Sequence, residues 1–228
     1  MSHRNYNMKS LISALVLVAY FPVVSMGDTG SPELARQAAF EEKRQIYAAI
    51  TGREATPTNL ESSLAAGSAT GTSMAEVVAA LDVMALSNRD PDILARQVLA
   101  CYERNPRDLE IKLACARTLL GIDKAKGVPI AREILANSNS TLRDRLLAAT
   151  YLTDVRELDG YSLLPEGLLS SNPIERRVAI SLLQRFAKFD SMQVPASTEK
   201  IDVRRLVQKL KSQTTDPKIL ADLAGVRF

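Results

Sequence analysis

The sequence predicts an all-α protein built of stacked antiparallel helix hairpins, a short α-solenoid with no sheet. Three observations predict this class. Ala and Leu, which favour helices, are abundant, whereas aromatic residues make up 5% of the chain and Trp is absent. Asx-Pro pairs divide the chain at intervals, and similar apolar helices recur with a nearly constant period. No run alternates β-branched and polar residues, so strands are not expected.

The first 27 residues have the pattern of a secretory signal peptide. Arg4 and Lys9 precede an apolar run over 11–24, and small residues follow. The run is shorter than the roughly 20 apolar residues that cross a membrane, so we expect cleavage after Gly27. The mature protein would then be periplasmic or secreted. An uncleaved signal anchor is the alternative.

Two segments are expected between the signal peptide and the main body. Residues 28–50 form an N-terminal helix, because Ser31 can accept a hydrogen bond as N-cap and Pro32 suits the first helical position. Residues 51–72 are rich in Thr, Ser, Gly and Ala and predict a flexible connector with a short helix at most. Residues 73–228 form the helical-repeat domain.

Helix starts in the repeat domain are marked by Ser73 and by four Asx-Pro pairs. Each pair places a side-chain acceptor at the N-cap and a proline where its missing N–H does no harm. The pairs are Asp90-Pro91, Asn105-Pro106, Asn172-Pro173 and Asp216-Pro217. Further helices are expected over 127–136, 141–155, 163–169, 174–189 and 199–211.

The period of the array follows from three similar segments. They begin at Leu109, Leu142 and Ile174, so their starts lie 33 and 32 residues apart. A period in this range is typical of stacked helix hairpins. One hairpin is too small to bury its own apolar side, so neighbouring hairpins are expected to share one core.

The segment over 163–179 resembles a short bacterial HEAT-type repeat. Its first helix, over 163–169, is leucine-rich with an internal proline, Asn172-Pro173 stands at the turn, and the second helix opens with basic and small apolar residues. The segment over 127–149 matches more loosely, and the resemblance covers roughly residues 73–189. It implies that Asn172, Pro173 and either Arg176 or Arg177 are structural and link one repeat to the next.

Cys101 and Cys115 are the only cysteines, and both fall on the apolar stripes of adjacent expected helices. Across an antiparallel turn the two positions are offset by four residues, or roughly 6 Å of helix rise. A disulfide needs Cα atoms about 4.4 to 6.8 Å apart. The sequence is therefore compatible with two buried free thiols and with a disulfide between Cys101 and Cys115.

Charge and histidine content exclude several functions. After cleavage the chain keeps 27 of its 29 Lys and Arg residues, against 26 Asp and Glu, so the near-neutral protein is not expected to bind nucleic acid. His3, the only histidine, is removed with the signal peptide. This excludes Ser-His and Cys-His nucleophile pairs and histidine metal ligands. We therefore predict no catalytic residue, no cofactor, no metal and no small-molecule substrate.

Basic residues gather in the C-terminal third of the chain. They could form a face that binds an acidic partner or anionic lipid. Alternatively, they are solvated side chains on amphipathic helices, together with the arginines that link one repeat to the next. Besides Arg176 and Arg177 they are Arg185, Lys188, Arg204, Arg205, Lys209 and Lys211.

These observations favour an exported scaffold that binds another protein, of the envelope assembly or immunity type. One alternative is a histidine-independent hydrolase that uses carboxylates or an oxygen-bound metal, for which Asp154, Glu157 and Asp159 are the candidates. The other is a peripheral membrane-binding module, which is not favoured.

Overall fold

The computed structural model describes residues 31–66, 73–194 and 200–226. Within these ranges the chain is all-helical and has no sheet, and Gln193 and Lys200 form an isolated antiparallel bridge. The predicted all-α class is therefore confirmed. The expected signal peptide with its cleavage site after Gly27, and residues 67–72 of the expected connector, lie outside the described residues.

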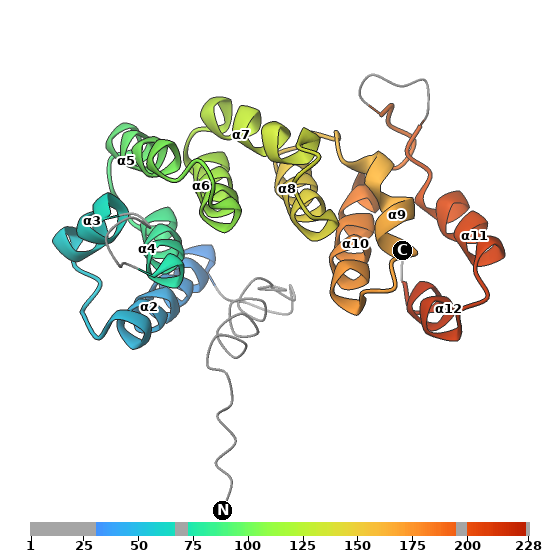
Figure 1. Ribbon diagram of the computed structural model, residues 1–228, viewed down its shortest axis with the longest axis horizontal. Coiled ribbons are helices and arrows are strands. Elements are labelled where there is room, and N and C mark those ends of the chain that lie inside the picture. The colour runs from blue at the N-terminus through green and yellow to red at the C-terminus, as the bar shows by residue number, and fades with distance from the viewer. Residues whose placement is uncertain (1–30, 67–72, 195–199, 227–228) are drawn as a thin grey trace, which may run out of the picture.

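The helices form an arch of two rows (Figure 1). Each hairpin joins a helix of the outer row to the next helix of the inner row, and neighbouring helices of the inner row pack side by side. The outer row consists of α3 (Pro57–Ala66), α5 (Pro91–Arg104), α7 (Lys124–Ala136) and α9 (Leu164–Leu168). The inner row consists of α4 (Met74–Leu86), α6 (Leu109–Ile122), α8 (Leu142–Asp154) and α10 (Pro173–Phe186).

Both ends of the arch carry further helices. At the N-terminal end, α2 (Pro32–Thr51) packs on α4. At the C-terminal end, α11 (Val203–Gln213) and α12 (Pro217–Ala224) follow α10. Two short 3₁₀ helices, η2 (Tyr161–Leu163) and η3 (Ala187–Phe189), flank α9 and α10.

Most of the predicted caps are present. Ser31, Ser73, Asp90, Asn172 and Asp216 each accept a hydrogen bond from a backbone N–H in the first turn of the helix that follows. Proline occupies the first turn after four of these five caps, all except Ser73. Local capping chemistry therefore determines where these helices begin.

The predicted helix start at Asn105-Pro106 is wrong. The helix begins at Leu109, because Asp108 is its N-cap and accepts from the backbone N–H of Ile111 over 3.1 Å. Asn105 instead ends the preceding helix, where its buried side-chain amide donates to the carbonyl of Cys101 over 2.7 Å. The amide is thus engaged on the preceding helix, and the cap moves three residues along the chain.

A helix occupies part of the segment for which we expected a flexible connector. Helix α3 begins at Pro57, and its Leu60 and Leu64 are each 3% exposed. Both leucines belong to the core that also contains Tyr47 of α2, whose hydroxyl lies 2.8 Å from Oγ of Ser63. Two leucines four residues apart form a weak apolar pattern, but α4 and α5 pack against this helix. The short helix that the sequence allowed around 60–66 is therefore present, begins three residues earlier, and is stabilised by tertiary packing.

The core runs through the hairpins in two clusters that meet at α8. Leu152 belongs to the N-terminal cluster, and Leu146, from the same helix, to the C-terminal one. The close approach of α9 to α10 requires a glycine, since a Cβ on Gly167 would lie 2.7 Å from the Cβ of Ala179. Each helix of the inner row packs against the outer helix of its own hairpin and against the adjacent helices of the inner row.

Candidate interaction surfaces

The inner face of the arch is the side of the inner row that points away from the outer row. In α10, Ala179 packs against Gly167 of α9. Ile174, Arg177 and Gln184 lie on the opposite side of the same helix, and all three are exposed. These residues define the inner face at α10.

The same helical geometry orients α6. Cys115 faces α5, so Glu110 and Gly121 lie on the opposite, inner side, and both are exposed. Partial burial raises the pKa of Glu110, while the positive charge of Arg143 on α8 opposes that rise. The inner face therefore combines opposite charges, small residues and apolar groups across neighbouring helices.

Ion pairs connect the helices that line this face. Asp82 of α4 pairs with Lys43 of α2 over 3.5 Å and with Arg117 of α6. Farther along the arch, Asp154 of α8 accepts from Nε of Arg185 over 2.7 Å. Burial, followed by the charge of Arg117, lowers the pKa of Lys43. These pairs connect neighbouring helices along the direction of stacking.

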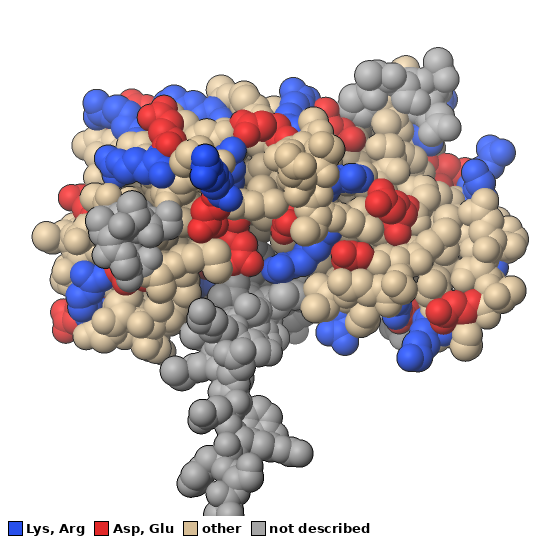
Figure 2. All heavy atoms as spheres, in the orientation of Figure 1, with Lys and Arg blue, Asp and Glu red and all other residues tan. Residues whose placement is uncertain are grey.

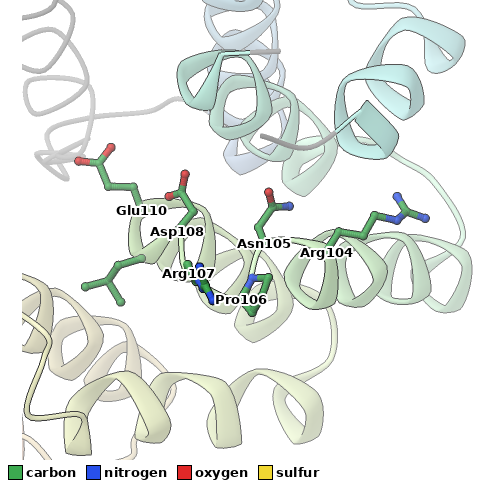
Figure 3. Close-up of a pocket in the computed structure, with 7 residues that line it drawn as sticks. Arg104, Asn105, Pro106, Arg107, Asp108 and Glu110 are labelled. Atoms are coloured by element: carbon green, nitrogen blue, oxygen red, sulfur yellow. The ribbon is translucent and has the colours of Figure 1, made fainter. Parts of the chain in front are cut away.

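A hollow of about 520 Å³ lies at the turn between α5 and α6 (Figure 3). All its lining residues belong to one continuous segment, over 104–110. In Figure 3 the side chain of Arg104 extends along α5, whereas Asp108 and Glu110 lie at the other end of the group. Because a single turn makes the hollow, it is a depression of the surface and not a cleft between helices.

The acidic residues over 157–159, the carboxylates of the hydrolase hypothesis, contact basic side chains of α7. Glu157 pairs with Lys124 at 2.8 Å and with Arg132 at 2.9 Å. Asp159 accepts from the same guanidinium at 3.1 Å, and this hydrogen bond raises the pKa of Arg132. With Asp154 bound to Arg185 of α10, all three candidate carboxylates form ion pairs with side chains of another helix.

The residues singled out by the HEAT resemblance lie at the start of α10. Asn172 is the N-cap, and its Oδ1 accepts from the backbone N–H of Ile174 over 3.0 Å, with Pro173 at the first helical position. Arg176 is only 7% exposed and donates to Asp222 of α12. Arg176 is therefore the candidate arginine that contacts the next hairpin, whereas Arg177 lies on the inner face.

The two cysteines face each other inside the α5–α6 hairpin as free thiols. Both are completely buried, and the amide of Asn105 lies 3.8 Å from Sγ of Cys101. The side-chain hydrogen bond that Cys115 makes with Cys101, together with burial, raises the pKa of Cys115. This thiol is therefore held in its protonated form.

A basic surface forms at the C-terminal end of the arch. Of the residues proposed for it, Arg185 is instead bound to Asp154, and Lys188 lies exposed at η3. Exposed basic residues lie along α11 and at Lys200, three residues before the helix begins, and Figure 2 shows positive side chains projecting at that end. This C-terminal basic surface consists of Lys200, Arg204, Arg205, Lys209 and Lys211.

A second hollow, of about 880 Å³, adjoins this surface. Tyr161, Ser162 and Pro165 line one side of it, and residues of α11 and the preceding turn line the other. Unlike the hollow over 104–110, it is lined by segments far apart in sequence, so only the folded chain forms it. Sequence reasoning had no signal for it.

Residues 31–66, 73–194 and 200–226 contain neither a membrane-spanning helix nor a cluster of metal-binding side chains. None of the helices described there combines the length and apolarity of a membrane span. The same residues contain no group of three or more His, Cys, Asp or Glu side chains placed to hold a metal ion. Comparisons with protein-family models, curated proteins and solved structures give no match to this chain.

Proposed function

We propose that this protein is an exported scaffold that binds another protein on the inner face of a HEAT-like helical array. The observation that supports the proposal is the side-by-side packing of α4, α6, α8 and α10, which makes one curved surface from several hairpins. Stacked-helix proteins use such surfaces to bind extended stretches of a partner. An envelope assembly factor and an immunity protein that masks a toxin both fit this mode of binding.

The side chains of the inner face suit protein recognition. Ile174, Arg177 and Gln184 are an apolar, a charged and an amide side chain on one rigid helix. Arginine and apolar groups contribute most at the centres of protein interfaces, and polar groups add specificity. Binding of this kind requires no reactive side chain, which agrees with the lack of histidine beyond His3.

Site-specific photocrosslinking of the exported protein tests the proposal. A crosslinker at Gln184, on the inner face, is compared with one at Arg96, an exposed residue of the outer helix α5. We expect one protein to be captured from the inner position and not from the outer one. With that partner purified, Arg177→Glu should weaken binding about tenfold or more, while Arg96→Glu leaves the affinity unchanged.

Other outcomes would overturn the proposal. Equal capture from both positions would remove the inner face as the binding site. A mature protein that binds no partner under gentle conditions and turns over a small molecule would favour the hydrolase alternative. N-terminal sequencing of the exported protein tests the signal peptide separately, with Asp28 expected as the first residue.

A further inference from the structure

Acidic and basic residues have different roles at the C-terminal end of the arch. Within 200–226 there are three acidic residues, and each has a structural partner. Asp202 accepts from the backbone N–H of Arg205 over 2.8 Å as the N-cap of α11. Asp216 caps α12 in the same way, and Asp222 is bound to Arg176 of α10. No carboxylate of this segment is therefore left to neutralise its cations.

The basic residues of the same segment, unlike the acidic ones, are not bound to charged side chains. Six Lys and Arg side chains lie within 200–226, and among the described residues none of them forms an ion pair. Over 31–185, by contrast, twelve Lys and Arg side chains are ion-paired. The positive charge at this end thus remains available to an external group.

Helix α11 holds its cations outside its buried apolar stripe. Val203, Val207 and Leu210 are at most 4% exposed and anchor the helix to the core. Arg205 and Lys209, one turn apart, lie opposite this apolar stripe, and Arg204 and Lys211 lie on one flank of the helix. A helix fixed through its apolar side presents its cations without further ordering of the backbone, which lowers the entropic cost of binding.

The hollow of about 880 Å³ adds shape to this charge. Lys200, Arg205 and Lys209 line it together with two carboxylates, those of Asp190 and of the N-cap Asp202, and Tyr161 and Pro165 line it as well. An extended segment lying along α11 could place side chains into it. Carboxylates would meet the three cations, and aliphatic parts would contact the ring surfaces.

We propose that the C-terminal basic surface is a second docking surface and that it binds an acidic, Asp- or Glu-rich segment of a protein partner. A helix that binds a lipid surface inserts its apolar stripe into the membrane, but the stripe of α11 is already buried in the core. Nucleic acid is a poorer match because the chain as a whole has a formal charge of only +3. An acidic polypeptide needs only the local charge and the adjoining hollow. The surface is separate from the inner face, so the two proposals can fail independently.

Fluorescence polarisation with a labelled octaglutamate peptide tests this surface on the mature protein. The variant is Arg205→Glu/Lys209→Glu, and the matched control is Arg96→Glu/Arg107→Glu, which changes the net charge equally at exposed positions of another surface. We expect saturable binding by the wild type and the control, and binding about tenfold weaker or more in the variant. Affinity should fall as salt is raised from about 0.05 to 0.3 M. Carbodiimide crosslinks to Lys200 or Lys209, mapped by mass spectrometry, locate the peptide without any substitution.

Each remaining outcome overturns the inference. Equal losses in both double variants would show a response to net charge alone, and crosslinks spread over the whole protein would show the same. Tighter binding to phosphatidylserine vesicles or to duplex DNA than to the peptide would assign the surface to those ligands. Absence of peptide binding by the wild type would also reject it. Arg177→Glu should bind octaglutamate normally, so failure of the inner-face proposal is distinguishable.

Discussion

Arg176 of α10 donates from Nε to Asp222 of α12 over 2.7 Å and so joins two helices that lie 46 residues apart in the chain. Its Nη1 also donates to the carbonyls of Ser170 and Ser171, over 2.9 and 3.1 Å. The guanidinium thus fastens the turn before α10 to the last hairpin. Because the side chain of Asp222 is 42% exposed, water screens the ion pair, and the partly buried hydrogen bonds to the carbonyls contribute the larger share.

We predict that Arg176→Ala lowers the free energy of unfolding by about 1 to 2 kcal/mol, the cost of removing the buried guanidinium and its hydrogen bonds to two partly buried carbonyls. Arg177→Ala is the matched control, since this neighbour is exposed and should change the free energy of unfolding by less than about 0.5 kcal/mol. Urea unfolding followed by circular dichroism measures both. Similar losses in the two variants would contradict the structural role of Arg176.

The pH dependence of one outer-row contact is a second prediction. Tyr102 of α5 donates to Glu133 of α7 over 2.5 Å, and burial, with this hydrogen bond, raises the pKa of Tyr102 to about 12. An unfolded tyrosine titrates near 10, so above that pH the unfolded state loses its proton first. The contribution of this contact to stability is therefore complete below about pH 10 and is lost as pH rises toward 12.

Ultraviolet titration of tyrosine absorbance measures this shift. The difference between wild type and Tyr102→Phe should show one phenol titrating near pH 12. Glu133→Gln removes the negative charge, so the pKa of Tyr102 should move back toward its ordinary value. A wild-type difference curve centred near 10 would rule out the contact.

The sequence predicted the parts of this structure that depend on a few adjacent residues. N-cap side chains and first-turn prolines act within one turn, so Asp90, Asn172 and Asp216 mark real helix starts. The failure at Asn105 has the same local origin, because two possible caps lie three residues apart and the amide of Asn105 binds the carbonyl of Cys101 on the preceding helix instead. Local chemistry thus predicts helix boundaries well and fails where two local solutions compete.

Contacts between hairpins were beyond such reasoning. The period over 109–174 predicts that hairpins stack, but the rotation of each helix about its axis depends on its neighbours' side chains. The choice of Arg176 over Arg177 for the contact with α12 is set by that rotation, and so is the orientation of the inner face. The same limit applies to the hollow beside α11, whose lining residues come from distant segments.

Two glycines make a third, paired prediction. A Cβ on Gly127 of α7 would lie 2.6 Å from the backbone nitrogen of Leu120 in α6, so Gly127→Ala forces the two helices apart. We expect a loss of about 1 to 3 kcal/mol in the free energy of unfolding. Gly121→Ala is the control, because nothing lies within 4 Å of the added methyl group and alanine favours the helix, by up to about 1 kcal/mol. Thermal or urea unfolding should therefore shift in opposite directions, and a shift in the same direction would contradict the close approach of α6 and α7.

The last prediction concerns the attachment of α2 to the arch. Asp82, whose side chain is 13% exposed, is the shared partner of Lys43 and Arg117. Asp82→Asn leaves two partly buried cations facing each other, and we expect a loss of about 2 kcal/mol at pH 7. The pKa of Lys43 is already lowered by burial and by Arg117, and the loss of the carboxylate lowers it further. The folded state then binds this proton less tightly than the unfolded state does, so stability recovers as pH rises.

Urea unfolding of Asp82→Asn at pH 7 and at about pH 9.5 checks both parts, with a smaller deficit expected at the higher pH. Glu41→Gln is the control, since it removes an exposed pair with Arg44 within one helix and should cost less than about 0.5 kcal/mol. Limited trypsin digestion locates the effect, because loosening of α2 exposes the bonds after Lys43 and Arg44. If Asp82→Asn unfolds and digests like Glu41→Gln, α2 is held by its apolar contacts alone, and the ion pairs along the inner row add nothing measurable to the stacking of the arch.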